Sequence, residues 1–298
     1  MAKRTLDQLD VAGKRVLVRV DFNVPIDQGM EGISLYDQRL RATLPTINYL
    51  IEQGSKVVLC SHLGRPKGEV VDGLRLAPVG DRLAFLLGRP VKSLPEIIGP
   101  VVADAIGAMA PGDIVLLENL RFNPGEEKND GAFACELADS VDCFVNDAFA
   151  VCHRAHASTD GITKFLPSAM GLLVQREVEE MGKALESPDK PLAALMGGAK
   201  VSDKILLLDN LLEDLDRLFI GGGMCVTFLN ALGFLTGDSR IEEDRLEFAR
   251  EIMERAEKAN IEVHLPDYVV IANEFKADPS ETDVMHVGDV PDGWYIMD

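Results

Sequence analysis

The sequence alternates short apolar runs, rich in β-branched residues, with longer stretches in which apolar residues have helical spacing. The apolar runs of the first half are RVLVRV at 15–20, KVVLC at 56–60, DIVLLEN at 113–119 and a strand within DCFVNDAFA at 142–150. Helical spacing occupies the stretches between them, at 38–54, 76–88, 95–109 and 131–140. Strands this apolar, separated by helices, indicate a parallel sheet that helices cover on both faces.

A long helical stretch with a polar face, MGLLVQREVEEMGKALESP at 170–188, interrupts this pattern. A second alternation follows, with strands expected at PLAALMGG, DRLFIGGG, IEVHLP, DYVVIANEF and WYIMD, and helices at 199–215, 224–233 and 239–260. A chain of 298 residues is also longer than one ordinary core supports. We therefore predict an α/β protein of two Rossmann-like three-layer domains with parallel sheets, residues 1–169 and 189–298, joined by the helix at 170–188.

The composition argues against several classes of protein. The net charge is −19, which disfavours nucleic acid and anionic membranes as partners, and it is uneven, −4 over residues 1–173 and −15 over 174–298. No apolar stretch approaches the roughly 20 residues of a membrane helix. The N-terminus lacks the apolar segment of a signal peptide, and the five cysteines form no C-x-x-C pair. We expect a cytoplasmic protein without disulfides or a zinc site.

Polar and charged side chains follow the predicted strands of the first half. Ligands of open parallel sheets bind beyond the carboxyl ends of the strands. Asp21 and Asn23 follow the first strand, His62 and Arg65 the second, Arg121 the third, and His153, Arg154 and His156 the fourth, while Arg39 begins the first long helix. Guanidinium groups match phosphate and carboxylate oxygens two at a time, so this edge suits a small acid with several negative charges.

Each of these side chains also has a purely structural interpretation. Arg65 in G-R-P would brace a turn, and His62 would be a satisfied loop histidine. Arg39 would belong to the solvated face of a helix, and Asp21 would cap a turn. The coincidence at four strand ends favours a binding site, because turns need no arginine.

Two glycine clusters mark the second half. In MGGAKVSDKILLL, at 196–208, two glycines are expected to end a strand and open a helix, which would present backbone N–H groups outward. Lys200 and Lys204 lie four residues apart near that helix start, where cations are unfavourable unless an anion lies between them. FIGGGMCVTF, at 219–228, would permit close approach of a flat or phosphorylated ligand. Close packing of a helix against a strand is the alternative for both clusters.

An acid-binding edge on one domain and a nucleotide-like site on the other predict phosphoryl transfer. The transition state spreads negative charge over the moving group, so positioning and cationic donors supply most of the catalysis. Domain closure would bring the two sites together and exclude water. A dinucleotide-dependent oxidoreductase is disfavoured, because no G-x-G-x-x-G follows the first strand.

Six stretches, RVDFNVP, SHLGRP, LLENLRF with NPGEE, NDAFAVCHRAHAS, GGAKVSDKI and GGGM, resemble the phosphoglycerate kinase family and run in its order over essentially the whole chain. The resemblance implies reversible phosphoryl transfer between 1,3-bisphosphoglycerate and Mg-ADP, giving 3-phosphoglycerate and ATP in glycolysis. It also implies a monomer and no covalent enzyme intermediate. Val151 and Cys152 depart from the small residues usual in the family, which would alter local packing and leave Arg154 in place.

The resemblance further assigns individual residues. The acid-substrate residues of the family fall on Asp21, Asn23, Arg39, His62, Arg65, Arg121 and Arg154, and its nucleotide-binding residues on Gly197, Gly198, Lys200, Lys204, Gly221 and Gly222. Arg39 and Lys204 would be the catalytic cations that steady the transferring phosphoryl group.

The end of the sequence departs from the family pattern. The chain stops at Asp298, inside an apolar run, whereas the resemblance implies about a hundred further residues. The aspartate that binds Mg²⁺ would lie downstream of Asp298, so no residue of this chain is assigned to the metal. We therefore expect a partial nucleotide-binding domain with little kinase activity of its own. The alternative function is that of a truncated, catalytically inactive relative that binds 3-phosphoglycerate.

Overall fold

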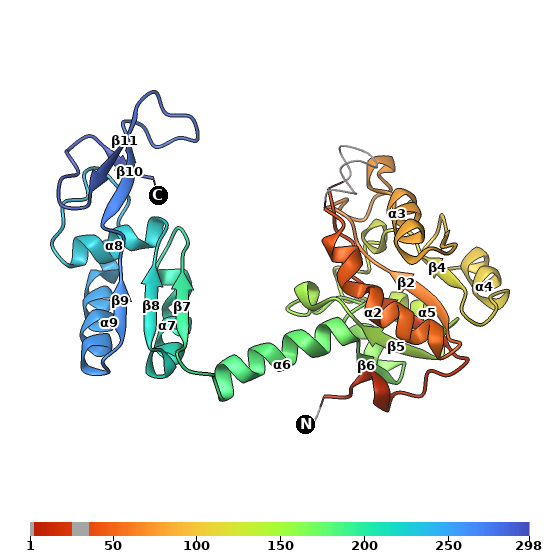
Figure 1. The fold of residues 1–298 in the computed structure, drawn as a ribbon. Coiled ribbons are helices and arrows are strands. Elements are labelled where there is room, and N and C mark those ends of the chain that lie inside the picture. The colour runs from red at the N-terminus through yellow and green to blue at the C-terminus, as the bar shows by residue number, and fades with distance from the viewer. Residues whose placement is uncertain (1–2, 26–35, 298) are drawn as a thin grey trace. The chain divides into compact units, whose positions relative to one another are not determined.

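The computed structural model describes residues 3–25 and 36–297, and the chain divides into two compact units, residues 1–180 and 181–298 (Figure 1). The division falls inside helix α6 (Leu172–Glu186). No helix in the described residues is long and apolar enough to span a bilayer.

A six-stranded sheet forms the centre of the first unit. Its order is β3-β4-β2-β1-β5-β6, and every pair of neighbouring strands is parallel. The strands are β1 (Arg15–Arg19), β2 (Lys56–Cys60), β3 (Lys92–Ser93), β4 (Ile114–Leu116), β5 (Cys143–Asn146) and β6 (Ser168–Met170). The two edge strands are only two and three residues long, so no apolar pattern reveals them.

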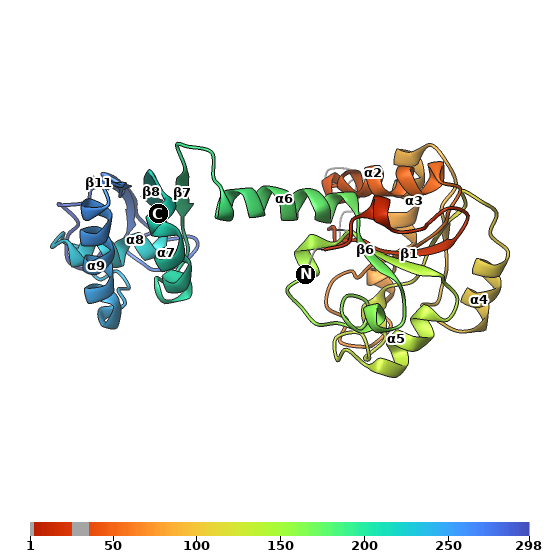
Figure 2. The ribbon, with the colours of Figure 1, turned by 90° about the horizontal axis from the view of Figure 1, so that it is seen from below.

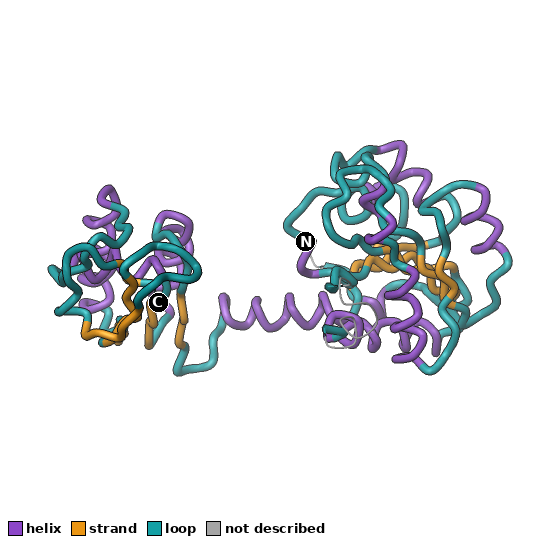
Figure 3. Tube along the Cα trace, turned by 90° about the horizontal axis from the view of Figure 1, so that it is seen from above, coloured by secondary structure: helices purple, strands orange, loops and turns teal. Residues whose placement is uncertain are grey.

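Helices cover both faces of this sheet (Figures 2 and 3). The helices α2 (Gln38–Glu52) and α3 (Ala77–Leu87) lie on one face, and α4 (Pro100–Gly107) and α5 (Gly131–Ala138) on the other. Val16 and Val18 of β1 belong to the core with α2 and α3, whereas Leu17 belongs to the core with α4 and α5. All three are fully buried, which explains why the strands are apolar at every position rather than at alternate ones.

The helix α4 is shorter than the helix predicted at 95–109. Its start is fixed by Gly99, whose φ of 99° suits glycine and little else. Pro100 then occupies the first helical position, and a proline disfavours a helical conformation in the residue before it.

The second unit contains a parallel sheet in the order β7-β8-β9 and an antiparallel sheet in the order β11-β10-β12. The strands are β7 (Ala193–Met196), β8 (Arg217–Ile220), β9 (Glu262–His264), β10 (Tyr268–Ala272), β11 (Thr282–His286) and β12 (Tyr295–Ile296). The helices α7 (Ile205–Leu211), α8 (Gly223–Ala231) and α9 (Leu246–Lys258) share one core with them. The sequence does not reveal β11, because this strand is exposed along most of its length and has no apolar run.

Two helices of the second unit begin later than predicted. The stretch at 199–215 forms a short turn, η6 (Ser202–Lys204), before α7 and a closing turn, η7 (Leu212–Asp214). The stretch at 239–260 forms η8 (Glu243–Arg245) before α9. Glu242 lies at both helix starts: its side chain accepts hydrogen bonds from the N–H groups of Val201 and Ser202, and its own non-helical backbone (φ −94°, ψ 89°) directly precedes η8.

Candidate active site

The carboxyl ends of four neighbouring strands, β4, β2, β1 and β5, meet at one edge of the six-stranded sheet. The loops that follow these strands, with the start of α2, enclose a cavity of about 260 Å³. The cavity is lined by all seven residues that the sequence assigns to the acid substrate: Asp21, Asn23, Arg39, His62, Arg65, Arg121 and Arg154. Gly64, Ala150, Val151 and His153 complete the wall. The structure thus brings together residues that lie up to 133 positions apart, from Asp21 to Arg154.

Hydrogen bonds hold the loops after β1 and β2 against each other. The Asn23 Oδ1 accepts from the backbone N–H of Gly64 at 2.9 Å, and the Phe22 N–H donates to Ser61 Oγ at 2.9 Å. The carboxylate of Asp21 accepts a hydrogen bond from Nη1 of Arg39. Asp21 therefore orients the Arg39 guanidinium, which remains half exposed at the cavity wall.

Arg65 argues against the interpretation of this edge as a set of turns. The turn itself depends on Gly64, which has a φ of 62° and whose Cβ, if it had one, would lie 2.8 Å from Leu74 Cδ2. The Arg65 side chain is exposed on the cavity wall. Within the described residues its guanidinium makes no hydrogen bond or ion pair, so it braces no turn there and is available to a ligand.

Arg121 and Arg154 contribute to the cavity in different ways. Arg121 is buried; its Nη1 donates to the Gly64 carbonyl at 2.7 Å, and its Nε lies 3.1 Å from Glu127 Oε1. Burial lowers the pKa of Arg121, and the nearby Glu127 carboxylate opposes that shift. Arg154 is exposed, and its Nε donates to His153 Nε2 at 3.1 Å. One guanidinium is therefore fixed in the wall, while the other remains accessible from solvent.

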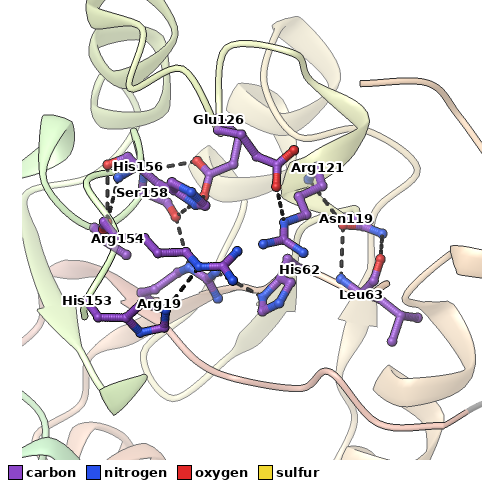
Figure 4. A network of polar contacts seen from close by, with 12 residues as sticks. Arg19, His62, Leu63, Asn119, Arg121, Glu126, His153, Arg154, His156 and Ser158 are labelled. Carbon is purple, nitrogen blue, oxygen red and sulfur yellow. Dashed lines mark hydrogen bonds and ion pairs between the residues drawn. The ribbon is translucent and has the colours of Figure 1, made fainter. Parts of the chain in front are cut away.

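A buried polar network contacts the cavity through His62 (Figure 4). Arg19 of β1 is 1% exposed; its Nη2 lies 3.1 Å from His62 Nδ1, and its Nε donates to Ser158 Oγ at 2.9 Å. Ser158 in turn donates to the carboxylate of Glu126, from Oγ at 2.6 Å and from N–H at 3.0 Å. Glu126 is completely buried, so Ser158 links two buried opposite charges that would each be costly alone.

Arg19 determines the hydrogen-bonding role of His62. A guanidinium can only donate, so the facing Nδ1 must accept, and the ring proton belongs on Nε2. Burial, followed by the charges of Arg19 and Arg121, lowers the pKa of His62 to about 2. His62 therefore enters the site as a neutral donor over the physiological pH range.

Asn119 supports the loops from below the cavity wall. It is completely buried; its Oδ1 accepts from the N–H groups of Leu63 and Arg121, both at 3.1 Å. Its Nδ2 donates to the carbonyls of Leu63 and Leu74, at 2.8 and 3.0 Å. One amide side chain thus joins the loop that carries His62 and Arg65 to the loop that carries Arg121.

Sequence reasoning did not identify the residues of this supporting network, Arg19, Asn119, Glu126 and Ser158. One signal was present: Arg19 is a charge inside an apolar strand whose two faces are covered, and such a charge must be paired. No local pattern identifies the partners, because Arg19 lies 43 residues from His62 and 139 from Ser158.

In the second unit the two glycine clusters pack against each other. The Gly221 N–H donates to the Met196 carbonyl at 2.9 Å, and the Met224 N–H donates to the Gly198 carbonyl at 2.8 Å. Gly222 has a φ of 62°, and a Cβ there would lie 3.2 Å from the Gly198 nitrogen. Close packing therefore requires at least Gly222, in keeping with the structural alternative, and the two clusters meet where β7 ends and α8 begins.

The two lysines do not share a helical face, contrary to the prediction. Lys200 lies in the loop between β7 and η6, and Gly198 in the same loop has a φ of 152°, which is not helical. Lys204 ends η6, and its Cε lies 4.0 Å from the position that a Gly198 Cβ would occupy. Nor are the first N–H groups of this turn presented outward, since those of Val201 and Ser202 donate to Glu242.

The family model of phosphoglycerate kinase matches residues 6–298. The chain belongs to the phosphoglycerate kinase family. A curated phosphoglycerate kinase from Moorella thermoacetica is 51% identical over all 298 residues, which cover 75% of its length. The protein accordingly has phosphoglycerate kinase function: it is a glycolytic phosphotransferase that moves a phosphoryl group reversibly between 1,3-bisphosphoglycerate and ADP.

The fold of this chain is similar to the folds of solved phosphoglycerate kinases. The enzyme from Coxiella burnetii matches with a TM-score of 0.78 at 38% identity, over 99% of this chain and 74% of its own. The enzyme from Pyrococcus horikoshii matches with a TM-score of 0.76 at 30% identity, over 96% of this chain and 75% of its own. These matches confirm the predicted α/β fold with parallel sheets, and the comparisons do not favour the alternative of an inactive binding protein.

Proposed function

We propose that the cavity of the first unit binds the acid substrate, 3-phosphoglycerate or 1,3-bisphosphoglycerate. The supporting observation is that seven polar or charged residues from four strand ends and α2 line this one cavity. Four of them are arginines, which suit the phosphate and carboxylate groups of the ligand. Asp21, Asn23 and the Nε2–H of His62 supply acceptors and donors for its hydroxyl and remaining oxygens.

We further propose that the glycine loops of the second unit bind the nucleotide. The predicted residues are Gly197, Gly198, Lys200, Lys204, Gly221 and Gly222. Residues 174–298 carry a net charge of −15, so a polyphosphate needs local cations, and the two lysines beside the packed glycine loops supply them. The Lys204 side chain returns toward Gly198, which supports a role beside this loop.

Mg²⁺ is proposed as the ion that accompanies the nucleotide. Mg²⁺ is commonly held by substrate phosphates and only one or two carboxylates, and it neutralises phosphate charge when bound. The described residues contain no group of three or more His, Cys, Asp or Glu side chains that could hold a metal. We assign none of them to the ion, and the roles proposed for the side chains do not depend on it.

The proposed chemistry needs cations and no proton transfer. The bond between phosphorus and the carboxyl oxygen of the acyl phosphate breaks, and a bond forms between phosphorus and a β-phosphate oxygen of ADP. The leaving carboxylate is stable without a proton, so no general acid is required. Arg39 and Lys204 are the proposed cations for the charge on the transferring group. A neutral His62 fits this scheme, because it orients the substrate without titrating.

Substitution of Arg65 tests the proposed acid site. Arg65→Ala removes a charge-assisted donor, so the affinity for 3-phosphoglycerate should fall by about 10- to 100-fold, measured by calorimetry. Lys67→Ala is the control, because Lys67 is an exposed cation of the same loop outside the cavity wall. Thermal unfolding should be unchanged in both variants. An unchanged affinity in Arg65→Ala would return Arg65 to the role of a turn residue.

We also propose that the enzyme acts as a monomer in the cytoplasm, with small molecules as its partners. The support is the family resemblance and the place of the reaction in glycolysis. Light scattering coupled to size exclusion should give the mass of one chain, and a dimer mass at micromolar concentration would contradict the proposal.

A further inference from the structure

The loop that carries the proposed nucleotide lysines is held by a carboxylate from a distant part of the second unit. Glu242 lies between α8 and η8. Its Oε2 accepts from the N–H groups of Val201 and Ser202, the latter at 3.2 Å, and its Oε1 accepts from Ser202 Oγ at 2.6 Å. These three bonds fix the chain directly after Lys200 and at the start of the turn that ends at Lys204.

Glu242 is itself held by the helix that follows the second glycine cluster. Its N–H donates at 3.2 Å to Oγ1 of Thr227, which is 2% exposed within α8. The same helix bonds the other end of the lysine loop, because the Met224 N–H donates to the Gly198 carbonyl. The segment 198–202 is therefore bonded to one helix at both ends, directly by Met224 and through Glu242.

The charge of Glu242 suits this role. Burial alone would raise the pKa of its carboxyl, but the hydrogen bonds from Ser202 and Val201 and the charge of Lys200 hold the pKa below its usual value. Glu242 is therefore ionised at neutral pH. A carboxylate is favourable beside the first N–H groups of a helical turn, and bonds to an ionised acceptor are stronger than neutral ones.

A local side chain would be sufficient to satisfy these two N–H groups, as serine or aspartate does at most helix starts. A carboxylate from 40 residues away does more, because it joins the loop to α8 through Thr227. It also carries negative charge near a proposed phosphate site, which is unfavourable for binding an anion. The bonds that it makes must therefore offset this repulsion by fixing the loop in one conformation.

We propose that Glu242 is a positioning residue for the nucleotide side of the reaction: it orders the loop that presents Lys200 and Lys204 before the nucleotide binds. This inference rests on the proposed function of that loop. A loop already ordered loses less conformational freedom on binding, so its affinity for the ligand is higher. Without the Glu242 carboxylate, nucleotide binding must also order the loop.

The test is Glu242→Ala, with Glu243→Ala as the matched control. Glu243 is the adjacent residue; its side chain is exposed, and the same negative charge is removed there. In Glu242→Ala the affinity for ADP should fall about tenfold, the affinity for 3-phosphoglycerate should not change, and backbone amides of 198–204 should exchange faster with deuterium. Glu243→Ala should leave all three quantities unchanged.

The conservative variant Glu242→Gln should recover most of the ADP affinity, to within about threefold of the parent, because its amide still accepts from Val201 and Ser202. If Glu242→Ala fails to fold, Glu242→Gln still allows the ADP affinity and the amide exchange to be measured. Equal ADP affinities in the parent and both Glu242 variants would overturn the proposal. So would a loss of ADP affinity without faster exchange in 198–204, because the effect would then be one of charge.

The variant Lys204→Met distinguishes a failure of this inference from a failure of the proposed nucleotide site on which it rests. If Lys204→Met binds ADP as the parent does, the assignment of the loop to the nucleotide is wrong. If Lys204→Met loses ADP affinity while Glu242→Ala retains it, the nucleotide site stands and the positioning role of Glu242 is wrong. Steady-state kinetics should agree, with a raised KM for the nucleotide in Glu242→Ala and an unchanged KM for the acid.

Discussion

The two proposed binding regions are built on different supports. The acid cavity presents side chains from four strand ends, and beneath them lie fully buried residues, Arg19, Asn119 and Glu126, that make several hydrogen bonds each. The lysine loop of the second unit is exposed at Gly197 and Gly198 and is held by one partly buried carboxylate, Glu242, and by the backbone bond from Met224 to Gly198. A change beneath the acid cavity should therefore affect folding and binding together, whereas a change at the lysine loop should affect mainly binding.

The cations of the two binding regions also differ in how much order they require of the backbone that carries them. Arginine presents a rigid planar fork, which is useful only when the backbone that carries it is fixed. Lysine is a flexible point charge, so it tolerates a loop whose order is completed when the ligand binds. The first unit has four arginines around its cavity, and the second has two lysines beside its glycines.

The largest expected effect is that of Asn119→Ala. This substitution leaves the N–H groups of Leu63 and Arg121 and two carbonyls without their partner in a buried site. We expect the free energy of unfolding to fall by about 4 kcal/mol and the affinity for 3-phosphoglycerate to fall with it. Urea unfolding followed by circular dichroism, together with calorimetry, measures both quantities.

The fluorescence of Trp294, the single tryptophan, shows whether the effect of Asn119→Ala is confined to the first unit. It packs against the core of the second unit, so its fluorescence reports the unfolding of that unit. The unfolding transition of Trp294 fluorescence should move little in Asn119→Ala. Asn48→Ala, at an exposed position of α2, is the control and should change neither the circular dichroism transition nor the fluorescence transition. A folded Asn119→Ala with parental affinity would break the proposed link between buried support and binding in the first unit.

Arg39→Ala should produce the next largest effect, and here binding and stability should separate. Arg39 lies half exposed on the cavity wall and is oriented by Asp21, so its loss removes about 2 kcal/mol of binding free energy for 3-phosphoglycerate with little loss of stability. Arg41→Ala is the matched control. Arg41 belongs to the same helix but pairs with Asp37 at 2.7 Å, outside the cavity wall. Equal affinities in the two variants would remove Arg39 from the proposed site.

The sequence predicts the acid cavity better than the lysine loop, for physical reasons. Buried parallel strands must be apolar at every position, so their ends are visible in the sequence, and the ends of neighbouring strands meet in space. The predicted start of the helix near Lys200 was wrong: the helical turn begins at Ser202, where the side chain of Glu242, some 40 residues away, accepts from the first N–H groups. Local periodicity contains no information on such a distant bond.

The pH dependence of the free energy of unfolding should reveal the burial of His62, the cavity residue that contacts the buried Arg19. In the folded protein the pKa of His62 is lowered to about 2, below its value of about 6.5 in the unfolded chain. The unfolded state therefore binds more protons as the pH falls below 6.5, and His62 should cost about 1.4 kcal/mol of stability for each further pH unit. Subtracting the pH profile of His62→Gln from that of the parent isolates this contribution. Identical slopes between pH 6.5 and 5 would show that His62 becomes protonated in the fold.

The smallest expected effect compares two adjacent glycines of the second unit. Gly222→Ala forces an alanine into a φ of 62° and places its Cβ 3.2 Å from the Gly198 nitrogen. We therefore expect the free energy of unfolding of the second unit, measured by Trp294 fluorescence, to fall by about 1 kcal/mol. Gly221→Ala is the matched control for stability alone, because no atom lies within 4 Å of its Cβ position and its φ is not positive. Gly222 touches the lysine loop at Gly198, so its substitution should also weaken ADP binding severalfold, whereas the affinity for 3-phosphoglycerate should not change. If Gly222→Ala unfolds at lower urea but binds ADP as the parent does, the glycine contact serves packing alone, and the order of the lysine loop depends on Glu242 instead.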